Sequence, residues 1–221
     1  LYVAMELLTK LKLKPRGLTV AIQGMGNVGG IFAQLAAQSG MRVVAMSDSQ
    51  SGIYSAKGLN VTAVERYKKE HGNLKGFPGA TGTTNARLLE LAVDVLVPAA
   101  LENQITKENA GRVRAKVVLE LANGPTTPEA DQKLAKKGIV LVPDVLANAG
   151  GVTVSYFELV QNVGQYYWDE GRVLAELKPT MVASFKQVWQ RAEQLKVTLR
   201  TAAYVVALER ITQAIEARGR Y

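Results

Sequence analysis

The fold of this 221-residue chain is decided by Leu18-Thr19-Val20-Ala21-Ile22-Gln23-Gly24-Met25-Gly26-Asn27-Val28-Gly29. Its first five residues are a short, apolar, β-branched run, typical of a strand that is buried on both faces. The glycines then fit G-x-G-x-x-G, and apolar residues at helical spacing follow until Gly40. The glycine pattern alone is weak, but a strand, a glycine turn and a helix in this order indicate a dinucleotide-binding unit.

A second strand is predicted at residues 42–47, and Asp48 follows it, nineteen residues after Gly29. In such a unit Gly24 makes the tight turn, Gly26 lets the backbone approach a pyrophosphate, and Gly29 lets the helix pack closely on the strand. The pyrophosphate accepts from the free N–H groups of the helix, and Asp48 accepts from the ribose hydroxyls. The alternative is a glycine-rich turn needed only for packing.

The cofactor that this unit prefers depends on the charge at the end of the second strand. A carboxylate at Asp48 repels the 2′-phosphate of NADP, and residues 49–51 bring no cation. The sequence therefore favours NAD, with NADP as the alternative.

The rest of the chain alternates between apolar runs and helical periodicity, and then becomes helical. Strands are predicted at 94–97, 117–121 and 139–142, and helices at 1–13, 61–70, 127–137, 149–169, 172–195 and 200–218. Strand–helix–strand repetition predicts an α/β fold with a mostly parallel, Rossmann-like sheet, flanking helices and a helical C-terminal tail.

Composition excludes several kinds of chemistry. Cysteine is absent and His71 is the only histidine, so disulfides, thiolate nucleophiles and multi-histidine metal sites are ruled out.

The formal net charge is +8, but basic and acidic residues are interleaved without the aromatics of a single-strand binding platform. We therefore expect no nucleic-acid partner, although a basic binding protein that reuses the fold remains an alternative. No signal peptide or membrane span is visible, which with the lack of cysteine predicts a cytoplasmic location.

Residues that follow the later strands are further candidates, because ligands of open α/β sheets bind beyond the carboxyl ends of the strands. Pro98-Ala99-Ala100 are small and leave room for a flat ring. Asn123 and Asn148 follow the next two strands, and a primary amide can match a nicotinamide carboxamide. Asparagine is equally common in turns and helix caps, and the spacing does not choose between these roles.

Five blocks of the sequence resemble the hexameric glutamate dehydrogenases, in the family's order and from end to end of the chain. They are residues 22–29, 47–49, 98–105, 122–131 and 148–158. The resemblance implies the NAD-binding part of an enzyme that interconverts L-glutamate with 2-oxoglutarate and ammonia, a homohexamer at full length. It also implies that residues 1–17 connect from a missing N-terminal domain, that 18–148 form the dinucleotide-binding core, and that 149–221 return toward the substrate domain.

The resemblance assigns roles to individual residues. Val152 and Ser155 match positions that meet the substrate's side chain, where the serine hydroxyl donates to the distal carboxylate of glutamate. A serine there favours glutamate over the apolar substrates of branched-chain dehydrogenases; a serine that faces only a helix neighbour is the alternative. The cofactor positions that match are Gly24, Gly26, Asn27, Val28 and Gly29 for the pyrophosphate, Asp48 and Ser49 for the ribose, Ala99, Ala100 and Asn123 near the nicotinamide, and Asn148 for its carboxamide.

No catalytic residue is assigned in this chain. The family's catalytic lysine and aspartate belong to the domain that precedes this part, and Lys10, Lys12 and Lys14 match none of its motifs. The 221 residues alone are therefore expected to bind cofactor without turnover. A branched-chain amino acid dehydrogenase domain and an isolated, inactive NAD-binding module are the other interpretations.

Overall fold

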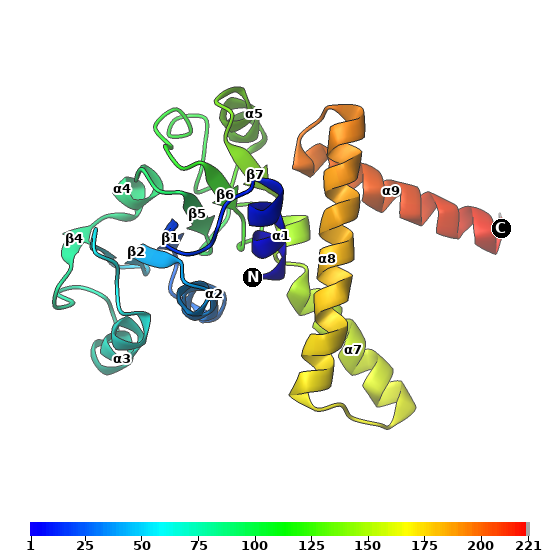
Figure 1. Ribbon diagram of the computed structural model, residues 1–221, viewed down its shortest axis with the longest axis horizontal. Helices are drawn as coiled ribbons and strands as arrows, with labels where there is room; N and C mark the ends of the chain where they lie inside the picture. Colours follow the sequence, from blue (N-terminus) through cyan, green and yellow to red (C-terminus); the bar gives the residue numbers. More distant parts are fainter. Residues whose placement is uncertain (220–221) are drawn as a thin grey trace.

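The computed structural model describes residues 1–219 and is built on a seven-stranded sheet (Figure 1). The strand order is β4-β3-β2-β1-β5-β6-β7. The five strands β2, β1, β5, β6 and β7 are parallel, whereas β3 runs antiparallel to both β2 and β4. Their bounds are β1 Thr19–Gln23, β2 Arg42–Ser47, β3 Gly52–Tyr54, β4 Thr81–Thr83, β5 Val95–Pro98, β6 Val117–Leu119 and β7 Val140–Val142.

Alternate residues of the parallel strands belong to two apolar cores, one on each face of the sheet. In β1, Val20 and Ile22 belong to one core and Ala21 to the other. The first core also takes residues from α1 (Tyr2–Lys10), α2 (Asn27–Gln38) and α3 (Val61–His71), and the second from α4 (Asn85–Leu89) and α5 (Pro128–Lys136). Burial on both faces explains why these strands are continuous apolar runs.

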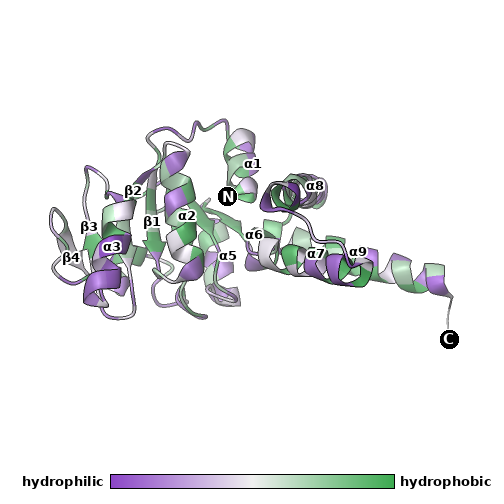
Figure 2. Ribbon diagram, turned by 90° about the horizontal axis from the view of Figure 1, so that it is seen from below, coloured by the Kyte–Doolittle hydropathy of each residue, from purple (hydrophilic) through white to green (hydrophobic). Residues whose placement is uncertain are grey.

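The C-terminal part is helical, as the sequence predicts. It comprises α6 (Asp144–Ala147), α7 (Gly150–Gly164), α8 (Glu170–Leu195) and α9 (Leu199–Arg218). Met181, Phe185 and Val188 of α8 join the first core, in which they meet α1. In contrast, α7 and the far half of α9 extend away from the sheet (Figures 1 and 2). Residues 220 and 221, the end of the expected C-terminal segment, lie outside the described residues.

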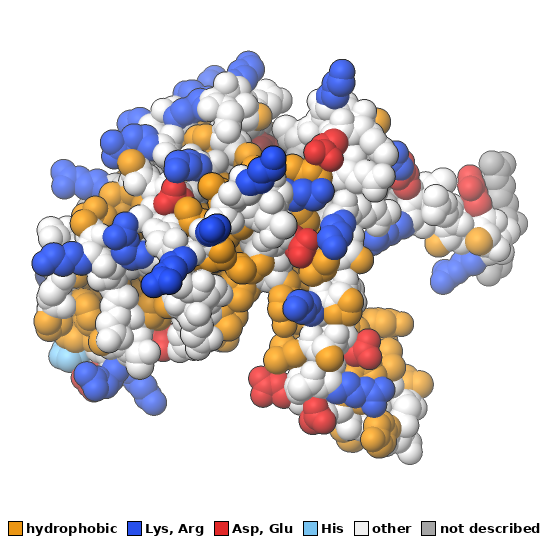
Figure 3. All heavy atoms as spheres, in the orientation of Figure 1, with side chains coloured by type: hydrophobic (Ala, Val, Ile, Leu, Met, Phe, Trp, Pro, Cys, Tyr) orange, Lys and Arg blue, Asp and Glu red, His pale blue; other side chains and the backbone are white. Residues whose placement is uncertain are grey.

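Exposed apolar side chains gather on the lobe that α7 forms with the start of α8 (Figure 3). Val152, Tyr156 and Val163 of α7 are all more than half exposed. Within residues 1–219, no helix is long and apolar enough to cross a membrane.

The predicted fold class is confirmed, but four short elements were not predicted from the sequence. These are β3, β4, α4 and α6, which are three to five residues long. Within the described chain, the crossover at residues 99–116 also contains turns and no α-helix, so the strand–helix–strand repetition fails there. Elements this short carry no measurable hydrophobic period, and Thr81-Gly82-Thr83 in β4 is not apolar at all.

Candidate functional site

The glycine turn lies at the carboxyl end of β1, in the middle of the sheet. The neighbours of β1 are β2 on one side and β5 on the other, so the chain order reverses at this point. A side chain at Gly24, where φ is +96°, would come within 2.7 Å of the Ala99 carbonyl oxygen. A side chain at Gly29 would come within 1.9 Å of the Gly24 carbonyl oxygen. Close packing therefore requires both glycines.

Gly26 differs from the other two glycines because space in front of it is open. A Cβ built there has no heavy atom within 4 Å. Gly26 is also the N-cap of α2, without a side-chain cap, and the exposed residues Asn27 and Val28 begin the helix. The backbone N–H groups of the first turn thus border an open space, an arrangement that fits an anionic pyrophosphate.

A cation that the sequence did not single out stands at this turn. The Lys68 ammonium group donates a hydrogen bond to the Met25 carbonyl oxygen from α3. Lys68 lies 43 residues further along the chain, and the dispersed basic residues gave no signal that it reaches the glycine turn. It adds positive charge where the pyrophosphate is expected.

Asp48 follows β2, as predicted, but both oxygens of its carboxylate accept hydrogen bonds from backbone N–H groups. Its Oδ1 accepts from the N–H groups of Gln50 and Ser51 at 2.8 and 2.7 Å, and its Oδ2 accepts from the N–H of Leu74 at 2.8 Å. The residue is only 7% exposed, whereas Ser49 at the tip of the turn is exposed. Asp48 anchors two loops, and its contact with the ribose stays a prediction.

Ser47 connects the glycine turn to α4. The N–H of Gly24 donates to the Ser47 carbonyl oxygen at 3.1 Å. The Ser47 hydroxyl donates to Asn85 Oδ1 at 2.6 Å, and Asn85 Nδ2 donates to the Asp48 carbonyl oxygen at 3.1 Å. Asn85 belongs to one of the unpredicted helices, so sequence reasoning missed it.

On the other side of the turn, the structure brings the two candidate asparagines together. Asn148 Nδ2 donates to Asn123 Oδ1 at 2.7 Å. Ala99 packs against the Gly24–Gly29 contact, and Ala100 next to it is exposed. These four predicted residues thus surround the carboxyl ends of β5, β6 and β7, and their contacts with a nicotinamide remain predictions.

Arg200, in the first turn of α9, forms ion pairs with three carboxylates that lie close to the loops of Asn123 and Asn148. Its guanidinium lies 2.7 Å from Glu120 Oε1, 2.8 Å from Asp131 Oδ2 and 3.3 Å from Asp144 Oδ1. The Glu120 side chain is 0% exposed. Burial raises the pKa of Glu120, because one guanidinium shared among three acids only partly compensates it. Burial opposes the charge of Arg200 as well, but Glu120 and Asp131 outweigh this and raise its pKa.

This cluster also holds the loops that carry the asparagines. Glu120 Oε2 accepts from the N–H of Asp144 at 2.8 Å, and Asp144 Oδ2 accepts from the N–H of Gly124 at 2.8 Å. Gly124 adjoins Asn123, and Asp144 begins α6, which ends just before Asn148. The sequence gave no sign of this cluster, since its members are up to 80 residues apart.

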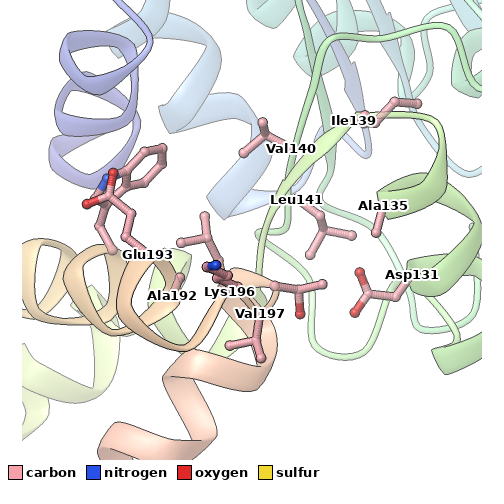
Figure 4. A pocket seen from close by; sticks show the side chains of 13 residues that line it. Asp131, Ala135, Ile139, Val140, Leu141, Ala192, Glu193, Lys196 and Val197 are labelled. Carbon is pink, nitrogen blue, oxygen red and sulfur yellow. The ribbon is translucent and has the colours of Figure 1, made fainter.

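A cavity of about 450 Å³ lies elsewhere, between α5, the start of β7 and the α8–α9 turn (Figure 4). Ile139, Val140 and Leu141 make one wall, and Ala192 and Val197 face them. Its position at the amino end of β7 separates it from the glycine turn, so it does not belong to the candidate site. Within residues 1–219 no group of acidic or histidine side chains could hold a metal ion.

Val152 and Ser155 lie three residues apart in α7 and therefore share one face of the helix. Both are exposed, Val152 to 71%. A substrate contact for either residue stays a prediction.

Comparisons with known proteins give a consistent result. A family model described as glutamate/leucine/phenylalanine/valine dehydrogenase matches residues 1–219. The glutamate dehydrogenase of Thermotoga maritima is 51% identical over 212 residues, which cover 96% of this chain and 51% of that protein. The NADP-specific enzyme of Synechocystis is 48% identical (99% and 53% covered), and the NAD-specific enzyme of Clostridioides difficile 46% identical (99% and 53%).

A solved structure supports the same relationship. The hetero-hexameric glutamate dehydrogenase of Thermus thermophilus, in its leucine-bound form, matches with a TM-score of 0.91 and 36% identity. The match covers 100% of this chain and 52% of that one. The chain thus spans about half the length of the relatives it matches.

Proposed function

Because the chain belongs to the glutamate/leucine/phenylalanine/valine dehydrogenase family, we propose that it is the nicotinamide-nucleotide-binding part of a glutamate dehydrogenase. The full-length enzyme interconverts L-glutamate with 2-oxoglutarate and ammonia. The observation that carries the proposal is the glycine turn, where two tightly packed glycines hold a third, Gly26, against open space at the start of α2. The relatives named above, all glutamate dehydrogenases, support the choice of substrate.

The chain's own residues bind and orient the cofactor in this proposal. N–H groups at Gly26, Asn27, Val28 and Gly29 bind the pyrophosphate, with Lys68 nearby. The other contacts are those of Asp48 and Ser49 with the ribose, of Ala99, Ala100 and Asn123 with the nicotinamide side, and of Asn148 with the carboxamide. When bound, the nicotinamide ring supplies the hydride acceptor or donor.

The substrate side of the proposal involves α7. Its exposed face presents Val152 and Ser155, and the Ser155 hydroxyl donates to the distal carboxylate of glutamate. A serine at this place favours glutamate over a branched-chain substrate. We assign proton transfer to none of the residues described. A hexamer, as named for the Thermus relative, and a cytoplasmic location complete the proposal.

The first experiment is a fluorescence titration of the 221-residue chain with NADH and with NADPH. Gly26→Ala puts a methyl group into space that the pyrophosphate needs, so it should weaken binding about tenfold or more, ~1.4 kcal/mol. Its free energy of unfolding should change little, because the methyl meets no atom within 4 Å. Gly29→Ala should instead destabilise the fold by about 1–3 kcal/mol or more, because its methyl collides with the Gly24 carbonyl.

Gly164→Ala is the matched control, since this glycine at the end of α7 also faces open space but lies outside the site. It should leave binding unchanged and raise the free energy of unfolding by no more than about 1 kcal/mol, because alanine favours a helix over glycine. If the folded chain binds neither nucleotide, the proposal is wrong. In the full-length protein, faster NADH oxidation with 2-oxoisocaproate than with 2-oxoglutarate would support the branched-chain alternative instead.

A further inference from the structure

The loop after β6 contains a residue pair that can react with itself. Asn123-Gly124 is the only Asn-Gly pair in the 221 residues. In such a pair the backbone nitrogen of the glycine can attack the side-chain amide of the asparagine, because glycine has no Cβ to hinder the approach. Gly124 is exposed and Asn123 is half-buried, so water and base can reach the pair. Asparagine is a thermolabile residue for this reason.

The reaction is a deamidation that needs only water and base. The Gly124 nitrogen gives up its proton and attacks Asn123 Cγ, where a C–N bond forms. The bond from Cγ to the amide nitrogen breaks, and that nitrogen leaves as ammonia with the proton. Water then opens the resulting succinimide at either carbonyl, which produces aspartate or isoaspartate. No atom is oxidised or reduced.

The structure holds the attacking nitrogen on a carboxylate. The Gly124 N–H donates to Asp144 Oδ2 at 2.8 Å. A carboxylate that accepts this hydrogen bond stabilises the protonated nitrogen and repels the negative charge that forms when the proton leaves. The contact with Asp144 therefore opposes the first step of the reaction.

The two sides of the reacting pair are held as well. Asn148 Nδ2 donates to Asn123 Oδ1 at 2.7 Å, which fixes the amide that would be attacked. The Gly124 carbonyl oxygen accepts from the N–H of Asn103 at 2.9 Å, and Gly124 has a φ of +55°. Closing the succinimide ring requires both groups to rotate, so these contacts must break first.

Asp144 is itself well anchored. Its Oδ1 accepts from the N–H of Val145 at 2.8 Å and from Arg200 at 3.3 Å, and its own N–H donates to Glu120 Oε2 at 2.8 Å. Within residues 1–219, Asp144 is the one carboxylate of the Arg200 cluster that hydrogen-bonds to the Asn123–Gly124 pair. The cluster thus fixes the acceptor that holds the Gly124 nitrogen.

We propose that Asn123 is a site of spontaneous deamidation and that Asp144 suppresses the reaction in the folded chain. The inference needs no nucleotide, so it stands or falls independently of the proposed function. Asn123 is also one of the proposed nicotinamide contacts. Its conversion to isoaspartate lengthens the backbone at that place, so the carboxyl edge of the sheet ages when the contact with Asp144 is lost.

The test follows deamidation at Asn123 by peptide mass spectrometry during incubation at mildly alkaline pH, in buffer and in urea. In urea the unmodified chain and Asp144→Ala should react at the same rate, because the contact is absent from both. In buffer the unmodified chain should react about tenfold or more slowly than in urea, and Asp144→Ala should remove most of this protection, since it deletes a charged acceptor.

Asp131→Ala is the matched control, because it also removes a carboxylate from Arg200 but leaves the Gly124 contact in place. Its rate in buffer should stay within about threefold of that of the unmodified chain, since only rare global unfolding then frees the pair. Gly124→Ala tests the chemistry in urea, where its methyl group should slow the attack. An equal rate for Gly124→Ala in urea, or no reaction of Asn123 there, overturns the deamidation site.

The role of Asp144 is overturned if the folded unmodified chain reacts as fast as in urea, or if Asp144→Ala reacts no faster than Asp131→Ala. Should Asp144→Ala fail to fold, hydrogen exchange of the Gly124 amide in the unmodified chain decides the question. An amide held by Asp144 exchanges slowly although its residue is exposed. Exchange as fast as in an unstructured peptide overturns the proposal.

Discussion

At the proposed adenosine end of the carboxyl edge, one carboxylate, Asp48, is held by three backbone N–H groups from its own turn and from the loop at Leu74. At the proposed nicotinamide end, three carboxylates share the single guanidinium of Arg200. The first arrangement closes within 26 residues of sequence, whereas the second joins residues up to 80 apart. The two ends of one site are thus stabilised in different ways.

This difference shows which single residue the stability of each end depends on. Backbone donors are present whatever the side chains are, so the adenosine end depends on one acceptor, Asp48. The nicotinamide end depends on one donor, Arg200, without which three acids face one another. Removal of Arg200 should therefore cost more than removal of the Asp48 charge.

Arg200→Leu should have the largest effect on stability. It leaves the buried Glu120 carboxylate without a counter-ion, and breaking such a pair costs about 3–5 kcal/mol. Urea unfolding followed by circular dichroism measures the loss. Arg191→Leu is the control, because its partner Glu209 is 39% exposed and the pair should contribute less than about 1 kcal/mol. Equal losses in the two variants would contradict the importance given to the Arg200 cluster.

Asp48→Asn should destabilise the fold, but less than Arg200→Leu does. The amide keeps one oxygen, but its NH₂ group replaces an acceptor that a backbone N–H now uses. An unsatisfied buried N–H costs about 1–3 kcal/mol, again measured by urea unfolding. Ser49→Ala, at the exposed neighbouring position, should change stability by no more than about 0.5 kcal/mol. A loss as large as that of Arg200→Leu would remove the contrast between the two ends.

The effect of Glu120→Gln on stability should depend on pH. Because burial raises the pKa of Glu120 in the folded state, its stabilising contribution is full below the ordinary glutamate pKa. That contribution is lost as the pH rises through the raised value, by roughly 1.4 kcal/mol for each unit of the shift. Relative to Glu120→Gln, the unmodified chain should therefore lose stability as the pH increases, which thermal unfolding at a series of pH values can measure.

Asp94→Asn is the control of opposite sign. Burial opposes the ionised form of Asp94, but hydrogen bonds from Lys116 and Thr19 outweigh it and lower its pKa. The Asp94 contribution is present above the ordinary aspartate pKa and is lost as the pH falls through the lowered value. The same direction of pH dependence at both positions would contradict one of the two assignments.

The sequence predicted the parts of the fold that local pattern determines. β2 spans residues 42–47, as predicted, and α5, predicted at 127–137, is found at Pro128–Lys136. The two short strands at one side of the sheet, β3 and β4, could not be predicted, because they have three residues each and depend on Gly52 fitting against Thr83. Pairing between strands of this length is decided by tertiary contacts, not by propensity.

The candidate site likewise has a part that local sequence predicts and a part that depends on distant segments. The glycine turn could be predicted from the glycine spacing together with the strand before it and the helix after it. The structure then distinguishes Gly26 from Gly24 and Gly29 through what surrounds each one. The backbone donors around Asp48 and the reach of Arg200 depend on distant segments that no local pattern connects. Side chains that act across 56 to 80 residues leave no trace in a single sequence.

The position of Arg200 after all seven strands also matters while the protein is being synthesised. Sheet residues up to β7 leave the ribosome before Arg200 is translated, so Glu120 has no counter-ion during that interval. We expect nascent chains that stop before α9 to leave the loops at Asn123 and Asn148 unanchored and to expose the apolar residues that α9 covers. Translation of α9 therefore completes the Arg200 cluster, and we expect ordering of the loops that carry Asn123 and Asn148 to wait until that helix has been made.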